Sequence, residues 1–270
     1  MTSRLTFALL LLLAAGCSGG GPTPPPTEVD LGETTFVVVV NPAIDDVNDV
    51  PVPEPGLERA DVLVRDVALD LGGPSDADGV YVLPLPEGEA GVRTLELSGG
   101  EASGTISQEI AAQDLVEVAL SGRPGEVQEM VRIRYAFGRE VVELSPEMGI
   151  DAVNDALSAS DRIVLLGGGV YEGDLVFGGS DVALFGAGVT GGEVTIVGNV
   201  TVSGQNNRIR GAIIDGDVTV SGSECGLSFT RVSGATEVSG SGGALLANEF
   251  CGGLSVGGDG TTALGNATDC

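Results

Sequence analysis

Residues 217–234 read DVTVSGSECGLSFTRVSG, and this 18-residue pattern occurs five times in the last third of the chain. The other copies begin at Asp174, Asn199, Ala235 and Gly253. The fourth position of each copy is apolar and the sixth is glycine; in chain order these columns are Phe177, Val202, Val220, Val238 and Val256, and Gly179, Gly204, Gly222, Gly240 and Gly258. A fixed period of this length is typical of a solenoid, in which each repeat buries its apolar side against the next.

Within a copy, apolar and polar residues alternate, as in the V-T-V of residues 218–220, and this two-residue period indicates β-strands. Each copy is therefore predicted to form one coil of a β-solenoid, with the fourth-position residues in one inward file. A second inward file is expected to hold Ile209, Leu227 and Leu245. The glycine column marks a turn that needs either a positive φ or a backbone too crowded for a Cβ atom.

The tenth position of the repeat indicates the handedness of the solenoid, because this position is not consistently apolar. A left-handed hexapeptide helix needs aliphatic residues six apart, but the tenth position of the copies holds Ala183, Arg208, Gly226, Ala244 and Thr262. The pattern therefore favours a right-handed parallel β-helix.

The chain is strongly anionic. Its twelve basic residues are all arginines, they face 39 acidic residues, and histidine is absent, so the formal net charge is −27. Phosphate binding needs clustered cations, so nucleic acid is not expected as a partner. A large excess of one charge sign favours solubility through self-repulsion.

The chain begins with an apolar leader. Residues 1–17, MTSRLTFALLLLLAAGC, contain one arginine and an apolar run that is too short to span a bilayer, which indicates an export signal. The A-A-G-C sequence ending at Cys17 resembles the lipobox of bacterial lipoproteins, although a secretory signal with a chance cysteine is the alternative. The resemblance implies an exported protein held on the outer membrane or cell surface by lipid on Cys17. Residues 18–32, rich in proline and glycine, are predicted to be a linker.

Residues 33–138 alternate short strand patterns with turn signals, which indicates a β-sandwich of some seven strands. The D-x-D-G-x-Y sequence formed by Asp76, Asp78, Gly79 and Tyr81 resembles a turn of the carboxypeptidase-regulatory-like, or transthyretin-like, sandwiches. A calcium loop would need further oxygen ligands, so a plain hairpin turn is expected at this sequence.

Residues 145–270 form the second predicted domain. Ser145 and Pro146 are typical of a helix start, and apolar residues recur at helical spacing over residues 150–157. The order of helix and then strand resembles the entrance of pectate-lyase-like parallel β-helices, where a short helix caps the first coil. Residues 192–198 interrupt the repeat and are expected to enlarge one coil. The overall fold class is thus all-β. Because that scaffold serves lyases, hydrolases and adhesins, the resemblance does not select a function.

Catalytic candidates are few. A glycosidase needs two facing carboxyl groups, for which Asp215 and Asp217 are the nearest candidates. A lyase needs a base beside carboxylates that bind Ca²⁺, and Arg208 and Arg210 would supply that base. These arginines flank inward Ile209, so pairing with acids on a neighbouring coil explains them without chemistry. We therefore predict no catalytic site, cofactor or metal, with a calcium-assisted polysaccharide lyase or a glycosidase as the alternative.

Three cysteines remain if Cys17 carries lipid. Cys251 and Cys270 lie one coil and one residue apart in the repeat, so their Cα atoms are predicted to be roughly 5.8 Å apart and disulfide-bonded. Cys225, at the ninth position, is expected on another side of the coil. Together, these features predict a lipid-anchored surface module that is structural or presents a ligand. Its broad coil faces would suit a polysaccharide.

Overall fold

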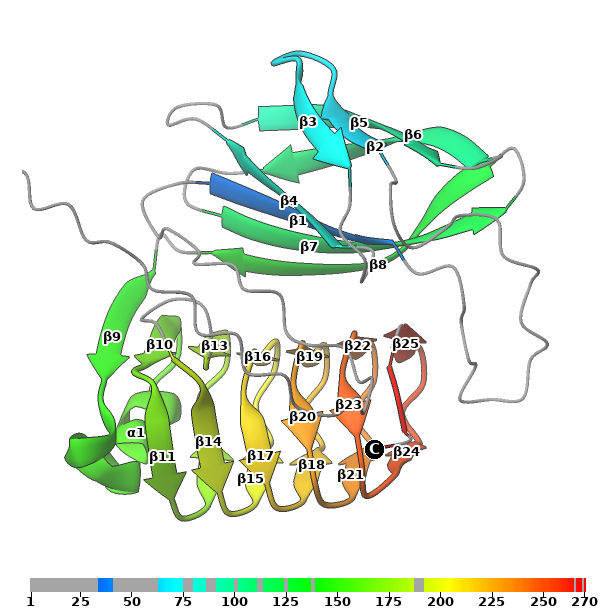
Figure 1. Ribbon diagram of the computed structural model, residues 1–270. Coiled ribbons are helices and arrows are strands. Elements are labelled where there is room, and N and C mark those ends of the chain that lie inside the picture. Colours follow the sequence, from blue (N-terminus) through cyan, green and yellow to red (C-terminus); the bar gives the residue numbers. More distant parts are fainter. Residues whose placement is uncertain are drawn as a thin grey trace, which may run out of the picture.

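The computed structural model describes residues 34–40, 63–74, 80–85, 91–99, 102–110, 114–123, 126–136, 139–186, 192–264, 266–268 and 270. These residues form an all-β structure in which antiparallel sheets are followed by a stack of parallel sheets (Figure 1). The predicted leader, linker and Asp76–Gly79 turn lie outside the described residues.

The N-terminal part is sandwich-like and contains two four-stranded sheets with the strand orders β4-β1-β7-β8 and β3-β2-β5-β6. All of their strand pairs are antiparallel except β1 with β7. Val64, Leu83, Leu95 and Leu97 are buried in this part. The strands are β1 (Thr34–Val40), β2 (Leu63–Asp66), β3 (Leu71–Pro74), β4 (Val80–Leu85), β5 (Gly91–Gly99), β6 (Ala102–Ile110), β7 (Asp114–Arg123) and β8 (Glu126–Ala136).

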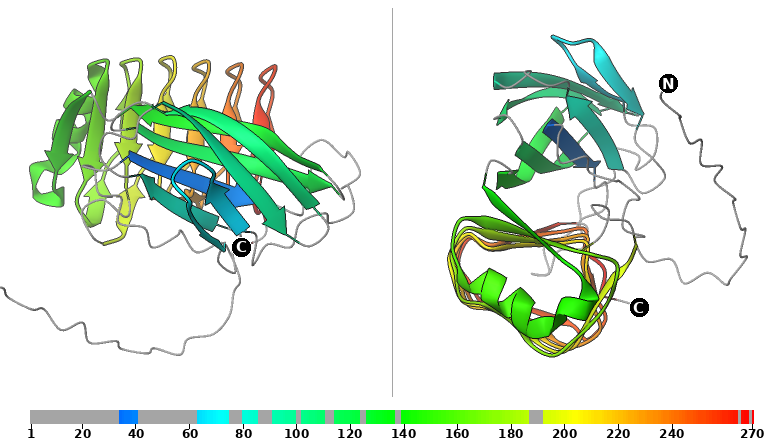
Figure 2. Two further views of the ribbon diagram at one scale, coloured as in Figure 1. Left: turned by 90° about the horizontal axis from the view of Figure 1, so that it is seen from above. Right: turned by 90° about the vertical axis from the view of Figure 1, so that its left-hand side faces the viewer.

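The C-terminal part is a right-handed parallel β-helix with three sheets (Figures 1 and 2). The first solenoid sheet contains β9 (Glu140–Leu144), β10 (Arg162–Leu166), β13 (Val182–Phe185), β16 (Arg208–Arg210), β19 (Gly226–Ser228), β22 (Ala244–Leu246) and β25 (Thr262–Leu264). The second contains β11 (Gly169–Glu172), β14 (Val194–Val197), β17 (Ile213–Asp215), β20 (Arg231–Val232) and β23 (Glu249–Phe250). The third contains β12 (Leu175–Phe177), β15 (Val200–Val202), β18 (Val218–Val220), β21 (Thr236–Val238) and β24 (Leu254–Val256). Residues 192–198 do not add an extra strand as predicted, because β14 is the regular second-sheet strand between β11 and β17. The insertion instead lengthens the stretch between β13 and β14, so the prediction of an enlarged coil holds but its extra strand does not.

The strand register confirms the predicted coils. Val220 pairs with Val202 on one side and Val238 on the other, so neighbouring coils are offset by one repeat. Leu227 likewise pairs with Ile209 and Leu245. These residues are buried, and both predicted files lie in one continuous apolar core.

Crowding explains the glycine column. A Cβ atom on Gly222 would lie 1.8 Å from the carbonyl oxygen of Gly204, and one on Gly240 would lie 1.8 Å from that of Gly222. The five glycines of the column have no positive φ. Of the two explanations open from the sequence, the close approach of successive backbones is therefore the correct one.

A short helix covers the start of the solenoid, as predicted, but it begins later than expected. Ser145 opens a 3-10 turn, η1 (Pro146–Met148), and its side chain makes no capping hydrogen bond. The α-helix α1 (Gly149–Ser158) follows, starting at a glycine with a φ of 79°. Because Val153 and Leu157 are buried against the first coil, α1 closes this end of the core.

Polar side chains connect the coils at two further columns. At the first position of the repeat, the side-chain oxygens of Asp174, Asn199 and Asp217 each accept a hydrogen bond from the backbone N–H one coil ahead, at 2.8–2.9 Å. At the fourteenth position, Asn248 accepts from the Thr230 N–H at 3.0 Å, and Asn266 accepts from the Asn248 N–H at 2.9 Å. These bonds satisfy backbone groups at the corners, where the strands end.

The outer face of the first solenoid sheet is covered. Ile163, Leu165 and Phe185 flank the inward file of this sheet, yet all three are buried. By contrast, Val170 on the second sheet and Val176 on the third are 53% and 48% exposed. The sandwich-like part lies over the first sheet, and its strand β8 contacts β22 and β25 (Figures 1 and 2). The second and third sheets are therefore the open faces of the solenoid.

Candidate functional site

An open groove of about 520 Å³ runs along the corner where the third solenoid sheet turns into the first. It crosses four consecutive coils, from the turn after β15 to the turn after β24. One wall of the groove is formed by the fifth position of the repeat, with Ser203, Ser221 and Ser239. The glycine column lies between this wall and a second one. The seventh position supplies Gln205, Ser223, Ser241 and Asp259. The same two walls are thus repeated coil after coil.

The glycines allow this groove to form. Each chain turn passes so close to the turn below that only glycine fits at the sixth position, which leaves a hollow between the flanking side chains. Below the groove, the ninth-position side chains donate to the glycine carbonyls of the previous coil. Asn207 Nδ2 donates to Gly179 O at 2.9 Å, and Thr261 Oγ1 donates to Gly240 O at 3.2 Å.

The serine hydroxyls are positioned by the solenoid itself. Ser203 Oγ donates to Phe177 O at 3.1 Å, and Ser221 Oγ donates to Val202 O at 3.5 Å. Because each hydroxyl oxygen also carries two acceptor lone pairs, it remains able to accept a hydrogen bond from a ligand. The described lining contains one carboxylate, Asp259, and neither an aromatic nor a basic side chain. This chemistry suits hydrogen bonding to a polar, uncharged ligand.

The structure distributes the four catalytic candidates over three sheets. Arg208 and Arg210 lie on β16 of the first solenoid sheet and flank Ile209, as predicted. Asp215 ends β17 on the second sheet, and Asp217 precedes β18 on the third. The arginine pair therefore lies on a different sheet from the two aspartates.

The two arginines have different neighbours. Arg210 is 2% exposed, and its guanidinium lies 5.1 Å from the centre of the Phe229 ring. Arg208 donates to the backbone carbonyl of Glu224 and, at 2.6 Å, to Asn206 Oδ1.

Each of the two carboxylates accepts a hydrogen bond from the same corner of the next coil. Ser233 Oγ donates to Asp215 Oδ1 at 2.7 Å, and the Ala235 N–H donates to Asp217 Oδ1 at 2.8 Å. Arg208 thus contacts Glu224 of the neighbouring coil through the Glu224 backbone carbonyl, while Asp215 and Asp217 accept hydrogen bonds from Ser233 and Ala235. The sequence pattern distinguishes inward from outward residues, but it does not reveal which outer face is covered.

Cys225 is buried beneath the groove at the ninth position, apart from the other described cysteines. Burial raises the pKa of its thiol, which disfavours the thiolate that a nucleophile needs. Its Sγ lies 3.3 Å from Gly204 O, in the place that Asn207 and Thr261 occupy in their coils. We therefore assign Cys225 a structural position.

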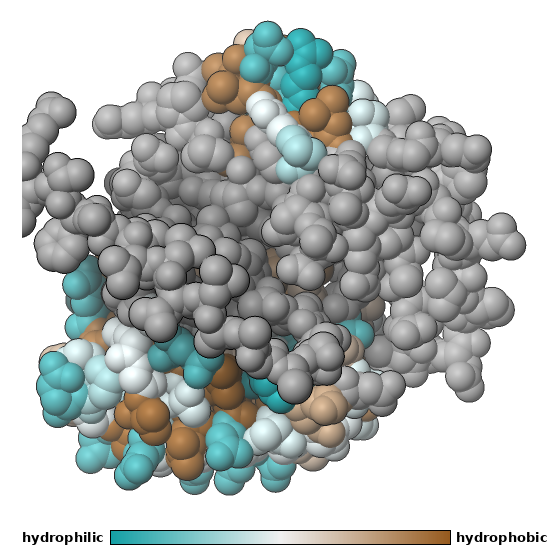
Figure 3. Space-filling model, viewed as in Figure 1, coloured by the Kyte–Doolittle hydropathy of each residue, from teal (hydrophilic) through white to brown (hydrophobic). Residues whose placement is uncertain are grey.

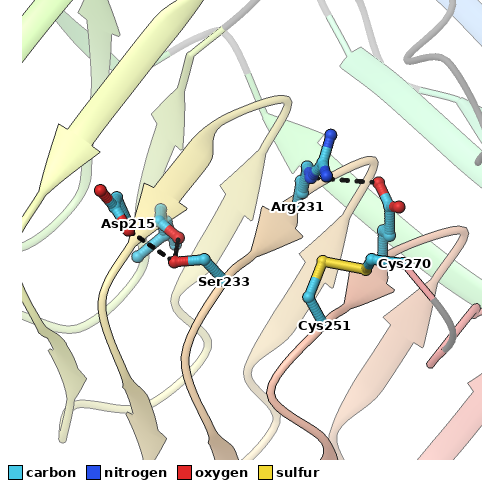
Figure 4. The surroundings of a disulfide bond; sticks show 7 residues. Asp215, Arg231, Ser233, Cys251 and Cys270 are labelled. Atoms are coloured by element: carbon cyan, nitrogen blue, oxygen red, sulfur yellow. Dashed lines mark hydrogen bonds and ion pairs between the residues drawn. A yellow bond between two sulfur atoms is a disulfide. The ribbon is translucent and has the colours of Figure 1, made fainter.

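Cys251 and Cys270 form a disulfide, with Cα atoms 5.2 Å apart (Figure 4). This is the pairing that the repeat predicts. The tail is also hydrogen-bonded to the solenoid, because the Phe250 N–H donates to Ala267 O at 2.7 Å and the Ala267 N–H donates to Asn248 O at 2.8 Å. A disulfide that closes a loop of this length stabilises a fold by about 3 kcal/mol.

Apolar surface on the open faces gathers near the start of the solenoid, where Figure 3 shows brown atoms over the coils below the grey ones. Val170 and Val197 on the second sheet are among the exposed apolar residues. The groove, which crosses the later coils, is polar by contrast.

Comparisons with protein families, curated proteins and solved structures found no significant match for this chain. Within the part of the chain that the structure describes, no helix has both the length and the apolar character needed to cross a membrane. Cys17 lies outside that part, so its lipidation stays a prediction.

Proposed function

We propose that the protein is an exported, lipid-anchored surface module whose solenoid presents the groove to a long polar polymer, with polysaccharide as the ligand class. The observation that carries this proposal is the repetition of the groove walls over four coils. Coils of a β-helix are spaced by about 4.8 Å, so hydroxyl groups recur at a regular short interval along the groove. A polymer with repeating hydroxyl groups can make the same contact several times.

The negative charge of the protein favours uncharged polysaccharides over anionic ones. With a net charge of −27 and Asp259 in the groove, an anionic chain would be repelled. Single hydrogen bonds exposed to water contribute little affinity, so binding would depend on many contacts in series. The proposed ligand is therefore a long, uncharged glycan.

Filling the groove should abolish this binding. We expect the double variant Ser221→Leu/Ser239→Leu to lose retention on neutral polysaccharides in affinity electrophoresis, because two bulky side chains would occupy the middle of the groove. The matched control is Ser233→Leu, since Ser233 is an exposed serine with a similar bond to Ile214 O, at 3.4 Å, on another corner. Equal binding by the groove variant and the wild type would contradict the proposal. Release of unsaturated uronate from an acidic polysaccharide would favour the lyase alternative instead.

The predicted lipid anchor can be tested by substituting Cys17. We expect full-length protein made in an exporting bacterium to partition with membranes, and Cys17→Ala to appear in the soluble fraction, because the lipid would be lost with the thiol. Cys225→Ala should still partition with membranes, since that buried thiol has no part in anchoring. Membrane retention of Cys17→Ala would show that the protein is not held by lipid on that residue.

A further inference from the structure

The last two coils bring three metal-ligating groups together on one side of the solenoid. A carboxylate oxygen of Glu249 and the sulfur atoms of Cys251 and Cys270 all lie within 4.8 Å of one another. In the structure the two sulfur atoms are joined as a disulfide (Figure 4). A cation could use these ligands only after that bond is reduced.

The backbone holds the three groups in place. Glu249 lies on β23, and Cys251 begins the turn that follows this strand. The N–H groups of these two residues donate to Thr230 O at 3.0 Å and Val232 O at 2.8 Å. Ala267 forms a parallel bridge to Glu249, which brings the tail with Cys270 to this edge. This bridge is made by backbone atoms, so the tail is held beside β23 by contacts other than the disulfide.

The ligand set has a definite metal preference. Two thiolates and one carboxylate suit a thiophilic divalent cation such as Zn²⁺ or Co²⁺, and not Ca²⁺ or Mg²⁺. Neighbouring ligands on a tetrahedral zinc ion lie roughly 3.5–3.8 Å apart, which is within the spacing of the cluster. Cys270 is exposed, so its side chain has room to turn and water can fill a fourth position.

The side chain of Arg231 has to move before a cation can bind to Glu249. Arg231 Nε lies 3.4 Å from Glu249 Oε2, and the arginine side chain is 52% exposed while that of Glu249 is 12% exposed. Because the arginine side chain is half exposed, its guanidinium can move into solvent when a cation takes its place beside Glu249.

We propose that the reduced protein binds one thiophilic divalent cation through Cys251, Cys270 and Glu249. A phosphine reductant supplies two electrons to the disulfide, water supplies two protons, and the phosphine leaves as its oxide. Metal binding then forms two sulfur–metal bonds and releases both thiol protons. The cation takes over the role of the disulfide, because it again connects the tail to β23.

Titration of the reduced full-length chain with Co²⁺ tests the proposal. After the phosphine is removed, we expect thiolate-to-metal charge-transfer absorption that saturates at one equivalent. Zn²⁺ should also raise the thermal unfolding midpoint of reduced protein and leave that of oxidised protein unchanged. The oxidised wild type is the matched control, because its thiols are blocked without any substitution.

The variants distinguish this cluster from other thiols. Cys270→Ser keeps the remaining three cysteines and should lose the absorption band, whereas Cys225→Ser should keep it. Glu249→Gln should bind with lower affinity, because a neutral amide replaces a charged ligand. Absence of the band in reduced wild type, or a band of full size in Cys270→Ser, would overturn the proposal. Unchanged affinity in Glu249→Gln would remove Glu249 from the ligand set.

Discussion

Val220→Asp is expected to lower the free energy of unfolding by about 5 kcal/mol, because it places a carboxylate inside the solenoid core. Val220 is 2% exposed and lies between Val202 and Val238 of the neighbouring coils. The core around it is apolar, so the new charge would be desolvated without a partner. Denaturant unfolding followed by circular dichroism measures the change.

Thr219→Asp is the matched control for this substitution. Thr219 precedes Val220 on β18 and is exposed, so the same carboxylate stays in water. Because Glu237 lies directly opposite on β21, the two like charges should cost something, and we expect a loss of under about 1 kcal/mol. Similar losses at the two positions would contradict the alternation of inward and outward residues on β18, and with it the register of the coils.

The coils could be predicted from the sequence because their signal is local. A side chain on a strand alternates in direction every two residues, and the 18-residue period aligns Val202, Val220 and Val238 without knowledge of any distant contact. The disulfide follows from the same register, since Cys251 and Cys270 differ by one coil and one residue.

The polar columns could not be recognised in this way. Thr230, Asn248 and Asn266 share the fourteenth position but not a residue type, and two of them accept hydrogen bonds from backbone groups one coil away. A hydropathy pattern shows only whether a residue is apolar or polar, so it does not predict such a hydrogen bond. The start of α1 was missed for a related reason, because Ser145 has the residue type of a cap but lacks the capping hydrogen bond.

The candidate site was missed although its signal was present. The S-G-S sequences at residues 221–223 and 239–241 repeat at the groove, but glycine was interpreted only as a turn residue. The surroundings of the arginines on β16 could not be predicted for a different reason. The burial of Arg210 depends on what covers the first solenoid sheet, and the repeat alone does not contain that information.

Gly240→Ala is expected to cost about 3 kcal/mol or more, although it adds a single methyl group. The new Cβ atom would lie 1.8 Å from the carbonyl oxygen of Gly222 and 2.6 Å from its carbon. These are backbone atoms, so no side-chain rotation relieves the contact. The coils would have to separate locally, which would weaken the bond from the Gly240 N–H to Val220 O, now 3.2 Å long. Thermal and denaturant unfolding measure the loss.

Gly257→Ala is the control that separates crowding from loss of backbone freedom. A Cβ atom on Gly257 would find its nearest atom, Val238 O, 4.0 Å away, whereas one on the adjacent Gly258 would lie 1.7 Å from Gly240 O. Gly257 has no positive φ, so alanine should be accepted there and should stabilise the protein by about 0.5 kcal/mol through a less flexible unfolded chain. The two substitutions are chemically identical, so the opposite signs that we expect would come from their surroundings alone. Equal losses at Gly240 and Gly257 would mean that glycine is required for its conformational freedom, and the close approach of successive coils would no longer explain the column.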